Sequence, residues 1–191
     1  MLSSINPLGE RARGQRFGVT VTAYLLGSVI GGMVMGSIGG LIGSVLPSGT
    51  WRPGVAAVLA MVGATLEIVD RVPPSLHRQV DENWLPRYRG WVYGLGFGAQ
   101  LGLGVATIIT SASVYVTVAL TVLSGSVWAG MLIGAVFGLV RSLPILSTFS
   151  AQDPASLRAM MRRLQGRLPL ASRAVVFAQV LFSVMALVAF T

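Results

Sequence analysis

The sequence predicts an all-α membrane protein, a polytopic helix bundle with five spans. Of its 191 residues, 53% are apolar and only 10% are charged. The mean hydropathy is +0.75. The apolar residues gather in long runs, several of which reach the roughly twenty residues that a helix needs to cross a bilayer. We expect a single integral membrane domain over residues 1–191.

The first expected span, 17–46, is an uncharged run that follows the basic stretch GERARGQRF. It is too long for the apolar part of a signal peptide and lacks a convincing cleavage site, so we expect an anchor that stays. The second span, 54–69, is short. Pro53 precedes it, and the charged, proline-containing segment 70–74 ends it.

The third expected span, 91–123, is too long for one straight helix, which would measure about 50 Å against a core of about 30 Å. We expect a break after Gly104, where β-branched and hydroxyl side chains follow a glycine-rich stretch. Broken helices often line cavities. The predicted cavity residues are Gln100, Thr107, Thr110 and Ser111. Alternatively, these hydroxyls bond back to their own helix.

The fourth and fifth expected spans, 127–146 and 174–190, flank an arginine-rich connector. Asp153 and Pro154 resemble a helix N-cap followed by proline at the first helical position. From there, apolar residues recur at helical spacing opposite arginines. The pattern favours an interfacial amphipathic helix over 154–168 on anionic lipids. A connector that happens to be amphipathic is the alternative.

Charge orients the spans, because arginine-rich segments stay on the cytoplasmic side. All fourteen basic residues are arginines, and only Arg52 falls on the predicted outer side. We expect a multi-pass protein of the inner cell membrane, with its N-terminus cytoplasmic and its C-terminus outside. The expected partners are a bilayer with anionic lipids and a membrane protein or a second copy. The net charge of +8 is spread between spans rather than gathered in one patch, so nucleic-acid binding is not expected.

Glycines recur four residues apart within three spans, a spacing that lets membrane helices approach closely. The predicted packing residues are Gly27, Gly31, Gly36, Gly40, Gly98, Gly102, Gly130, Gly134 and Gly138. Arg141, near the inner end of the fourth span, needs an acidic partner if it is buried. We predict an ion pair with Glu67 or Asp70, acting as a structural clamp rather than a proton relay.

Catalytic and metal-binding residue types are scarce. The chain has no cysteine and one histidine, His77, which leaves almost nothing from which to build a thiolate metal site or a Ser-His-Asp triad. We therefore expect no catalytic residue, cofactor site or metal site. An enzyme would be expected only if a cysteine-bearing helix precedes Met1.

The runs YGLGFGAQLGLGVATIIT and GSVWAGMLIGAVFGLVRSLPIL, between Tyr93 and Leu146, resemble helices of the CcdA/DsbD-type cytochrome c biogenesis family in the wider LysE-like group. The resemblance implies two inverted three-helix repeats, truncated here by one helix before Met1. It also implies a relay cysteine near 105–107, where none occurs.

These observations support three functional hypotheses. The leading one is a cysteine-free scaffold or accessory subunit of a membrane complex on a CcdA/DsbD-like fold. The second is a small-solute transporter whose site lies at the break in the third span. The third is transmembrane thiol-disulfide electron transfer, which requires an upstream helix that carries a cysteine.

Overall fold

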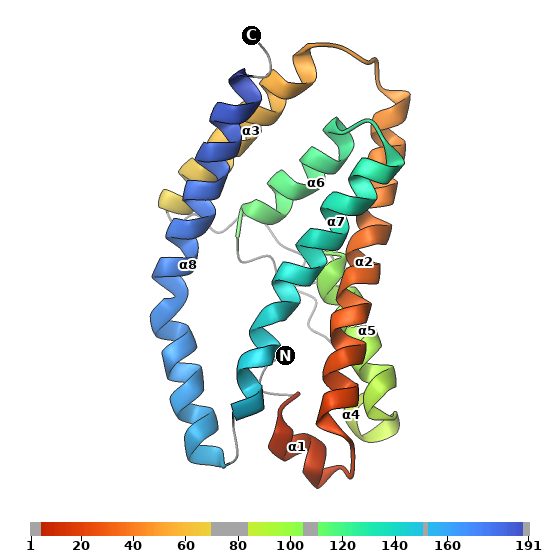
Figure 1. The fold of residues 1–191 in the computed structure, drawn as a ribbon, viewed down its shortest axis with the longest axis vertical. Coiled ribbons are helices and arrows are strands. Elements are labelled where there is room, and N and C mark those ends of the chain that lie inside the picture. The colour runs from red at the N-terminus through yellow and green to blue at the C-terminus, as the bar shows by residue number, and fades with distance from the viewer. Residues whose placement is uncertain (1–4, 70–83, 105–110, 151–152, 189–191) are drawn as a thin grey trace.

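The computed structural model describes residues 5–69, 84–104, 111–150 and 153–188, and within these ranges the chain is helical with no strand (Figure 1). The predicted all-α class is therefore confirmed. The helices are α1 (Pro7–Ala12), α2 (Phe17–Val45), α3 (Trp51–Ile68), α4 (Trp84–Arg87), α5 (Gly90–Gly102), α6 (Ser113–Leu123), α7 (Val127–Ser142), the 3₁₀ helix η1 (Leu143–Ser150) and α8 (Pro154–Val188).

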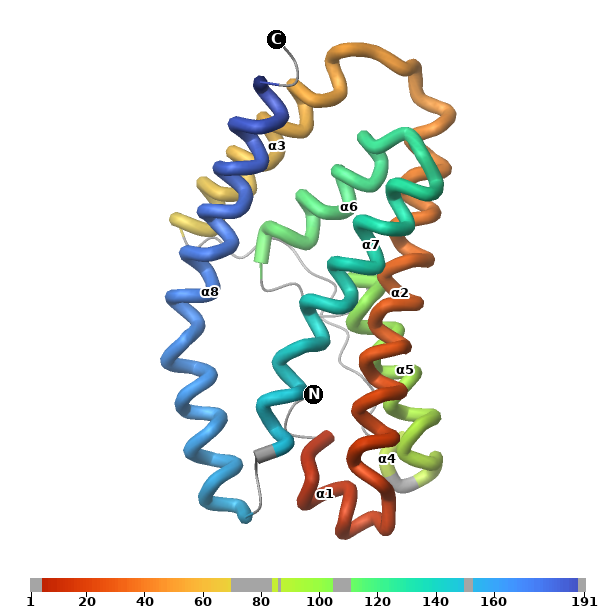
Figure 2. Tube along the Cα trace, viewed as in Figure 1, coloured from red at the N-terminus to blue at the C-terminus, as the bar shows by residue number. Residues whose placement is uncertain are grey.

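The long helix α2 is the centre of the bundle, with its most extensive contacts to α5 and α7. α3 and α8 form a second pair, and the short helix α6 contacts α2, α3 and α7. Figure 2 shows the same division, with α3 and α8 on one side, α6 between, and α2, α5 and α7 on the other. The bundle therefore has a tight core of three helices and an outer pair joined to it through α6.

Large apolar side chains cover much of the outside of the bundle. Its buried part combines glycines and other small residues with a cluster of larger side chains that includes Tyr24, Tyr93 and Phe97. Leu41, Val136 and Phe177 are each more than half exposed. Within the described ranges, four helical segments are long and apolar enough to cross a membrane: Phe17–Val45, Trp51–Ile68, Val127–Phe149 and Pro154–Val188. An apolar exterior of this extent suits lipid better than water.

The segment 91–123 is divided between two helices, as its length predicts. α5 ends at Gly102, Gly104 has the left-handed φ of 70°, and α6 begins at Ser113. At 1.5 Å per residue, α5 is about 20 Å long and α6 about 16 Å, so neither spans a core of about 30 Å alone. Five spans and an inverted repeat stay predictions.

The predicted interfacial helix and fifth span are one continuous helix, α8, of 35 residues. Pro169 lies inside it. The expected separation is wrong because a proline removes only one backbone N–H from the helical ladder, and the residues around it, such as leucine, alanine, methionine and arginine, favour helix. α8 is therefore about 50 Å long, with most of its arginines in the first half.

Candidate functional site

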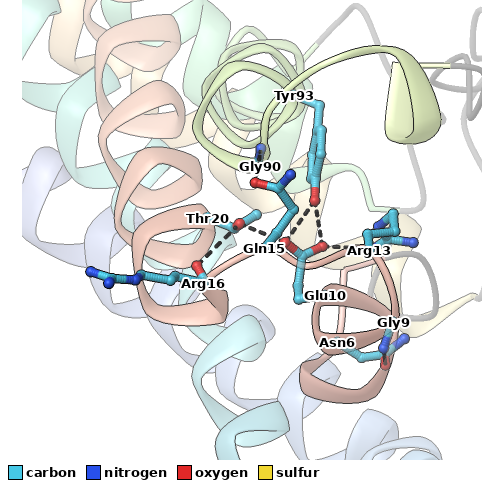
Figure 3. Close-up of polar contacts among 9 residues, drawn as sticks. All are labelled: Asn6, Gly9, Glu10, Arg13, Gln15, Arg16, Thr20, Gly90 and Tyr93. Atoms are coloured by element: carbon cyan, nitrogen blue, oxygen red, sulfur yellow. Dashed lines mark hydrogen bonds and ion pairs between the residues drawn. The ribbon is translucent and has the colours of Figure 1, made fainter.

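A cluster of polar side chains lies at one end of the bundle, where α1 meets the starts of α2 and α5 (Figure 3). At its centre is Glu10, which is fully buried. The Tyr93 hydroxyl lies 2.6 Å from both carboxylate oxygens, and the Thr20 hydroxyl donates to one of them at 2.7 Å. Arg13 forms an ion pair with Glu10 at 2.6 Å. Three donors, one from α5, one from α2 and one from the residue that follows α1, thus converge on one carboxylate.

Local backbone geometry places Glu10 in this position. The side chain of Asn6 caps α1 by accepting from the Gly9 amide at 2.8 Å. Gly14, with a φ of 67°, turns the chain toward α2. The side-chain oxygen of Gln15 then accepts from the Gly90 amide at 3.0 Å. This amide is at the start of α5, where backbone N–H groups have no acceptor within the helix. A short capped helix and a glycine turn therefore bring the chain before α2 back against α5.

The charges in the cluster balance one another. Burial lowers the pKa of Arg13, but its hydrogen bonds to Glu10 and Tyr93 outweigh this effect and leave the pKa above its ordinary value. The Arg13 guanidinium also lies 5.8 Å from the centre of the Tyr93 ring. Arg13 thus stays a cation opposite the carboxylate. The Glu10 carboxylate and its donors link α1 to α2 and α5. We call Glu10, Arg13, Thr20 and Tyr93 the Glu10 cluster.

The three core helices meet backbone to backbone at glycines. A Cβ on Gly32 would overlap the carbonyl oxygen of Gly134 in α7, and one on Gly98 would overlap that of Tyr24 in α2. The buried Ser28 hydroxyl donates to the Gly138 carbonyl at 2.7 Å across the α2–α7 contact. Close glycine packing and one interhelical hydrogen bond therefore define this crossing.

Each of the nine glycines predicted for packing faces the backbone of another helix closely enough to exclude a side chain. Those in α2 are Gly27 and Gly31, against α5, and Gly36 and Gly40, against α7 and the residue before it; Gly98 and Gly102 of α5, and Gly130, Gly134 and Gly138 of α7, face α2 in return. The four-residue spacing has put them on the faces where the helices cross.

Arg141 and Glu67, predicted as an ion pair, have different partners. Arg141 donates to the Leu101 carbonyl at 3.1 Å and lies 5.2 Å from the centre of the Phe137 ring. Glu67 accepts from the Ser111 hydroxyl. The Leu101 carbonyl also accepts from the Gly104 amide, and its second lone pair takes the guanidinium. A cation at the C-terminal end of a helix is favoured there without a carboxylate. The other predicted partner, Asp70, lies outside the described residues.

The predicted cavity at the break in the third span is described only in part. Gln100 and Ser111 are both half-buried, whereas Thr107 and Thr110 lie outside the described residues. The Ser111 hydroxyl also lies 2.6 Å from that of Ser113. This cavity stays a prediction. Among the described residues there is no group of three His, Asp or Glu side chains that could hold a metal ion.

The Glu10 cluster was missed from the sequence because GERARGQRF is dominated by its charges. The signal that could have revealed it is the cap before it, since Asn6 followed by Pro7 is a typical helix start. A helix there would have placed Glu10 and Arg13 three residues apart on one face.

Comparison with known proteins identifies the family. Over 184 residues, or 93% of this chain, the sequence is 30% identical to the methylamine utilization protein MauF of Paracoccus versutus, covering 67% of that relative. The chain belongs to the MauF family. MauF of Paracoccus denitrificans is 28% identical over 92% of this chain, and MauF of Methylophilus methylotrophus is 28% identical over 86%.

The chain spans about two thirds of the length of the MauF relatives, with 67% of the Paracoccus proteins and 60% of the Methylophilus protein covered. No family model matches the sequence. No solved structure matches it either.

The resemblance to the CcdA/DsbD-type family is wrong, since the curated relatives are MauF proteins. The hypotheses of a CcdA/DsbD-like scaffold or accessory subunit, a small-solute transporter and a thiol carrier fall with it, as do cytochrome c biogenesis and transport as descriptions. The run YGLGFGAQLGLGVATIIT misled because two of its glycines, Gly94 and Gly98, serve close packing against α2. Any tightly crossed membrane helix can acquire that pattern.

Proposed function

We propose that this chain is a multi-pass protein of the inner membrane that serves methylamine utilization. The observation that carries the proposal is the 30% identity to MauF of Paracoccus versutus over 93% of the chain. The helical fold supports a membrane location, because four segments of the described part of the chain have the length and hydropathy to cross a bilayer. We assign no catalytic step to the chain, since its sequence lacks cysteine and has a single histidine.

The proposed orientation places the Glu10 cluster and the start of α8 at the cytoplasmic face. The end of the bundle that holds α1 also holds the start of α8, and the end of α8 lies at the opposite end (Figure 1). Arg11, Arg13 and Arg16 precede α2, while Arg158 and Arg162 lie in the first turns of α8, which agrees with the cytoplasmic bias of arginine.

The first half of α8 is expected to contact anionic lipid headgroups. Arg158, Arg162, Arg163 and Arg167 are all exposed there, and arginine can keep its charge at the headgroups while its stem covers apolar surface. The apolar outer faces of the bundle would lie against lipid, and in part against a membrane protein or a second copy.

Growth tests the proposed function. A host strain from which the gene is deleted is expected to grow normally on ammonium and poorly when methylamine is the only nitrogen source. Expression of the chain from a plasmid is expected to restore growth on methylamine. Equal growth of the deletion strain and its parent on methylamine would contradict the proposal.

Fusions to alkaline phosphatase, which is active only outside the cytoplasm, test the orientation. Fusions after Pro47 and after Val188 are expected to be active, and those after Arg16 and after Asp153 inactive. The reverse pattern would place the Glu10 cluster outside and would contradict the orientation. It would not bear on the role in methylamine utilization, which the growth experiment tests.

A further inference from the structure

The side chain of Gln179, in the second half of α8, is buried without a hydrogen-bond partner. The residue is only 7% exposed. Neither its amide nitrogen nor its amide oxygen has a partner among the described residues. A buried amide without partners is costly, and in a membrane no bulk water can repay that cost. Gln179 therefore requires an explanation.

Gln179 differs in this respect from Ser183, one turn further along α8. The Ser183 hydroxyl donates to the Ala57 carbonyl of α3 at 2.9 Å and is fully buried, so it serves helix packing. Opposite Gln179, α3 has Gly63, where an added Cβ would come within 3.1 Å of the Gln179 amide nitrogen. The glycine leaves room for the amide but gives it no partner.

Gln179 lines a cavity of about 300 Å³ between α3, α6 and α8. Its other lining residues include Ala60, Val175 and Phe182, which are apolar, and Ser113 and Thr117, which carry hydroxyls. The Thr117 hydroxyl donates to the Ser113 carbonyl at 2.8 Å, so its oxygen keeps a lone pair that could accept. No charged side chain lines the cavity among the described residues.

We propose that this cavity binds a small uncharged amphipathic molecule whose polar head both accepts and donates hydrogen bonds, with the Gln179 amide as the recognition group. The amide nitrogen would donate to the head and the amide oxygen would accept from it. The apolar lining would hold the body of the molecule. The absence of charged lining residues in the described chain argues against an ion, and the apolar outer surface of α8 points to entry from the bilayer.

A ligand pair of matched shape tests the proposal. Benzyl alcohol and ethylbenzene differ by a hydroxyl in place of a methyl group, so only benzyl alcohol can bond the amide. Because the natural chain has no cysteine, Ala178→Cys introduces a single thiol at a residue that lines the cavity and is exposed. The rate of its alkylation by N-ethylmaleimide, in full-length protein in mild detergent, reports occupancy. Val184→Cys, on an exposed part of the same helix, is the control thiol.

Benzyl alcohol is expected to slow alkylation of Ala178→Cys at concentrations about tenfold below those at which ethylbenzene acts, as expected for the loss of one or two hydrogen bonds. The alkylation rate of Val184→Cys by N-ethylmaleimide should be the same in the presence of either molecule. Adding Gln179→Leu should abolish the difference between them, whereas Gln165→Leu, at an exposed position of α8, should preserve it.

Equal potency of the two molecules on the Ala178→Cys protein would overturn the proposal, and this comparison needs no change at Gln179. A preference for benzyl alcohol that survives Gln179→Leu would also overturn it, because the amide would then not be the recognition group. The result is independent of growth on methylamine, so the proposed function and this site can fail separately.

Discussion

Removing the Tyr93 hydroxyl is expected to loosen the attachment of α1 to the bundle. Tyr93→Phe deletes a donor to both oxygens of Glu10 and leaves Arg13 and Thr20 in place. A hydrogen bond to a charged group contributes about 1.5–3 kcal/mol. Because Glu10 is fully buried and keeps two donors, we expect Tyr93→Phe to lower the free energy of unfolding by about 2 kcal/mol.

Glu10→Gln is expected to cost more, about 3 kcal/mol, because it leaves the Arg13 cation without its counter-charge and also weakens the bonds from Tyr93 and Thr20. The exposed 26% of the Arg13 side chain keeps this value at the lower end of the range for broken buried pairs. The exposed Arg11 supplies a matched control, and Arg11→Gln should change stability by less than about 0.5 kcal/mol.

Reversible unfolding by sodium dodecyl sulfate in mixed micelles measures these changes. Because Glu10 and Tyr93 are hydrogen-bonded to each other, the stability losses of Glu10→Gln and Tyr93→Phe should not add. The double variant should lose at least about 1 kcal/mol less than the sum of the two single losses. Additive effects, or single losses no larger than that of Arg11→Gln, would refute the view that the cluster holds α1 to α5.

Three further predictions follow from the core and from the start of α8. Gly134→Leu, which forces a side chain against the α2 backbone, should destabilise the bundle by about 3 kcal/mol, whereas Gly18→Leu, with open space around it, should leave the unfolding curve unchanged. Ser28→Ala should lower the free energy of unfolding by about 0.6 kcal/mol in the same assay, the usual size for an interhelical hydrogen bond in a membrane protein. An unchanged free energy of unfolding would show that this bond does not stabilise the α2–α7 crossing. The Ser156 amide donates to the Asp153 carboxylate at the start of α8 and lowers its pKa below the ordinary 3.8. This helix cap is therefore present at neutral pH and is lost as pH falls through the lowered pKa. A carbon-13 NMR titration of Asp153 with a midpoint at or above 3.8 would contradict this.

The parts of the fold that depend on regular spacing could be predicted from the sequence. The glycine repeats indicated which faces of α2, α5 and α7 approach one another, because a helix brings residues four apart onto one side. The length of 91–123 indicated an interruption, because a bilayer limits how long a straight helix can be.

The parts that depend on tertiary partners could not be predicted in the same way. Glu10 is separated from Tyr93 by 83 residues, so nothing local indicates their contact. Arg141 has a backbone carbonyl as its acceptor, and carbonyls leave no mark in a sequence. The connector helix 154–168 and the span 174–190 were expected to be separate, although the single Pro169 between them leaves most of the helical ladder of α8 intact. Gln179 lies in an apolar run, and only the packing of α3 and α6 against α8 shows that it lines a cavity.

The family assignment shows a similar limit. Short glycine motifs in membrane helices indicate close packing, which many families share, and the glycine-rich runs between Tyr93 and Leu146 therefore matched the wrong family. Similarity over 184 residues, or 93% of the chain, separates families that a few glycines do not. The glycines do mark close helix packing, although the family that they suggested is wrong.

The growth rate of the deletion strain on methylamine is the measurement that decides whether the chain serves methylamine utilization. We predict a clear defect on methylamine as the only nitrogen source and none on ammonium, with growth restored by the wild-type chain and by Gly18→Leu, and not by Gly134→Leu. Unimpaired growth of the deletion strain on methylamine would contradict a role in methylamine utilization.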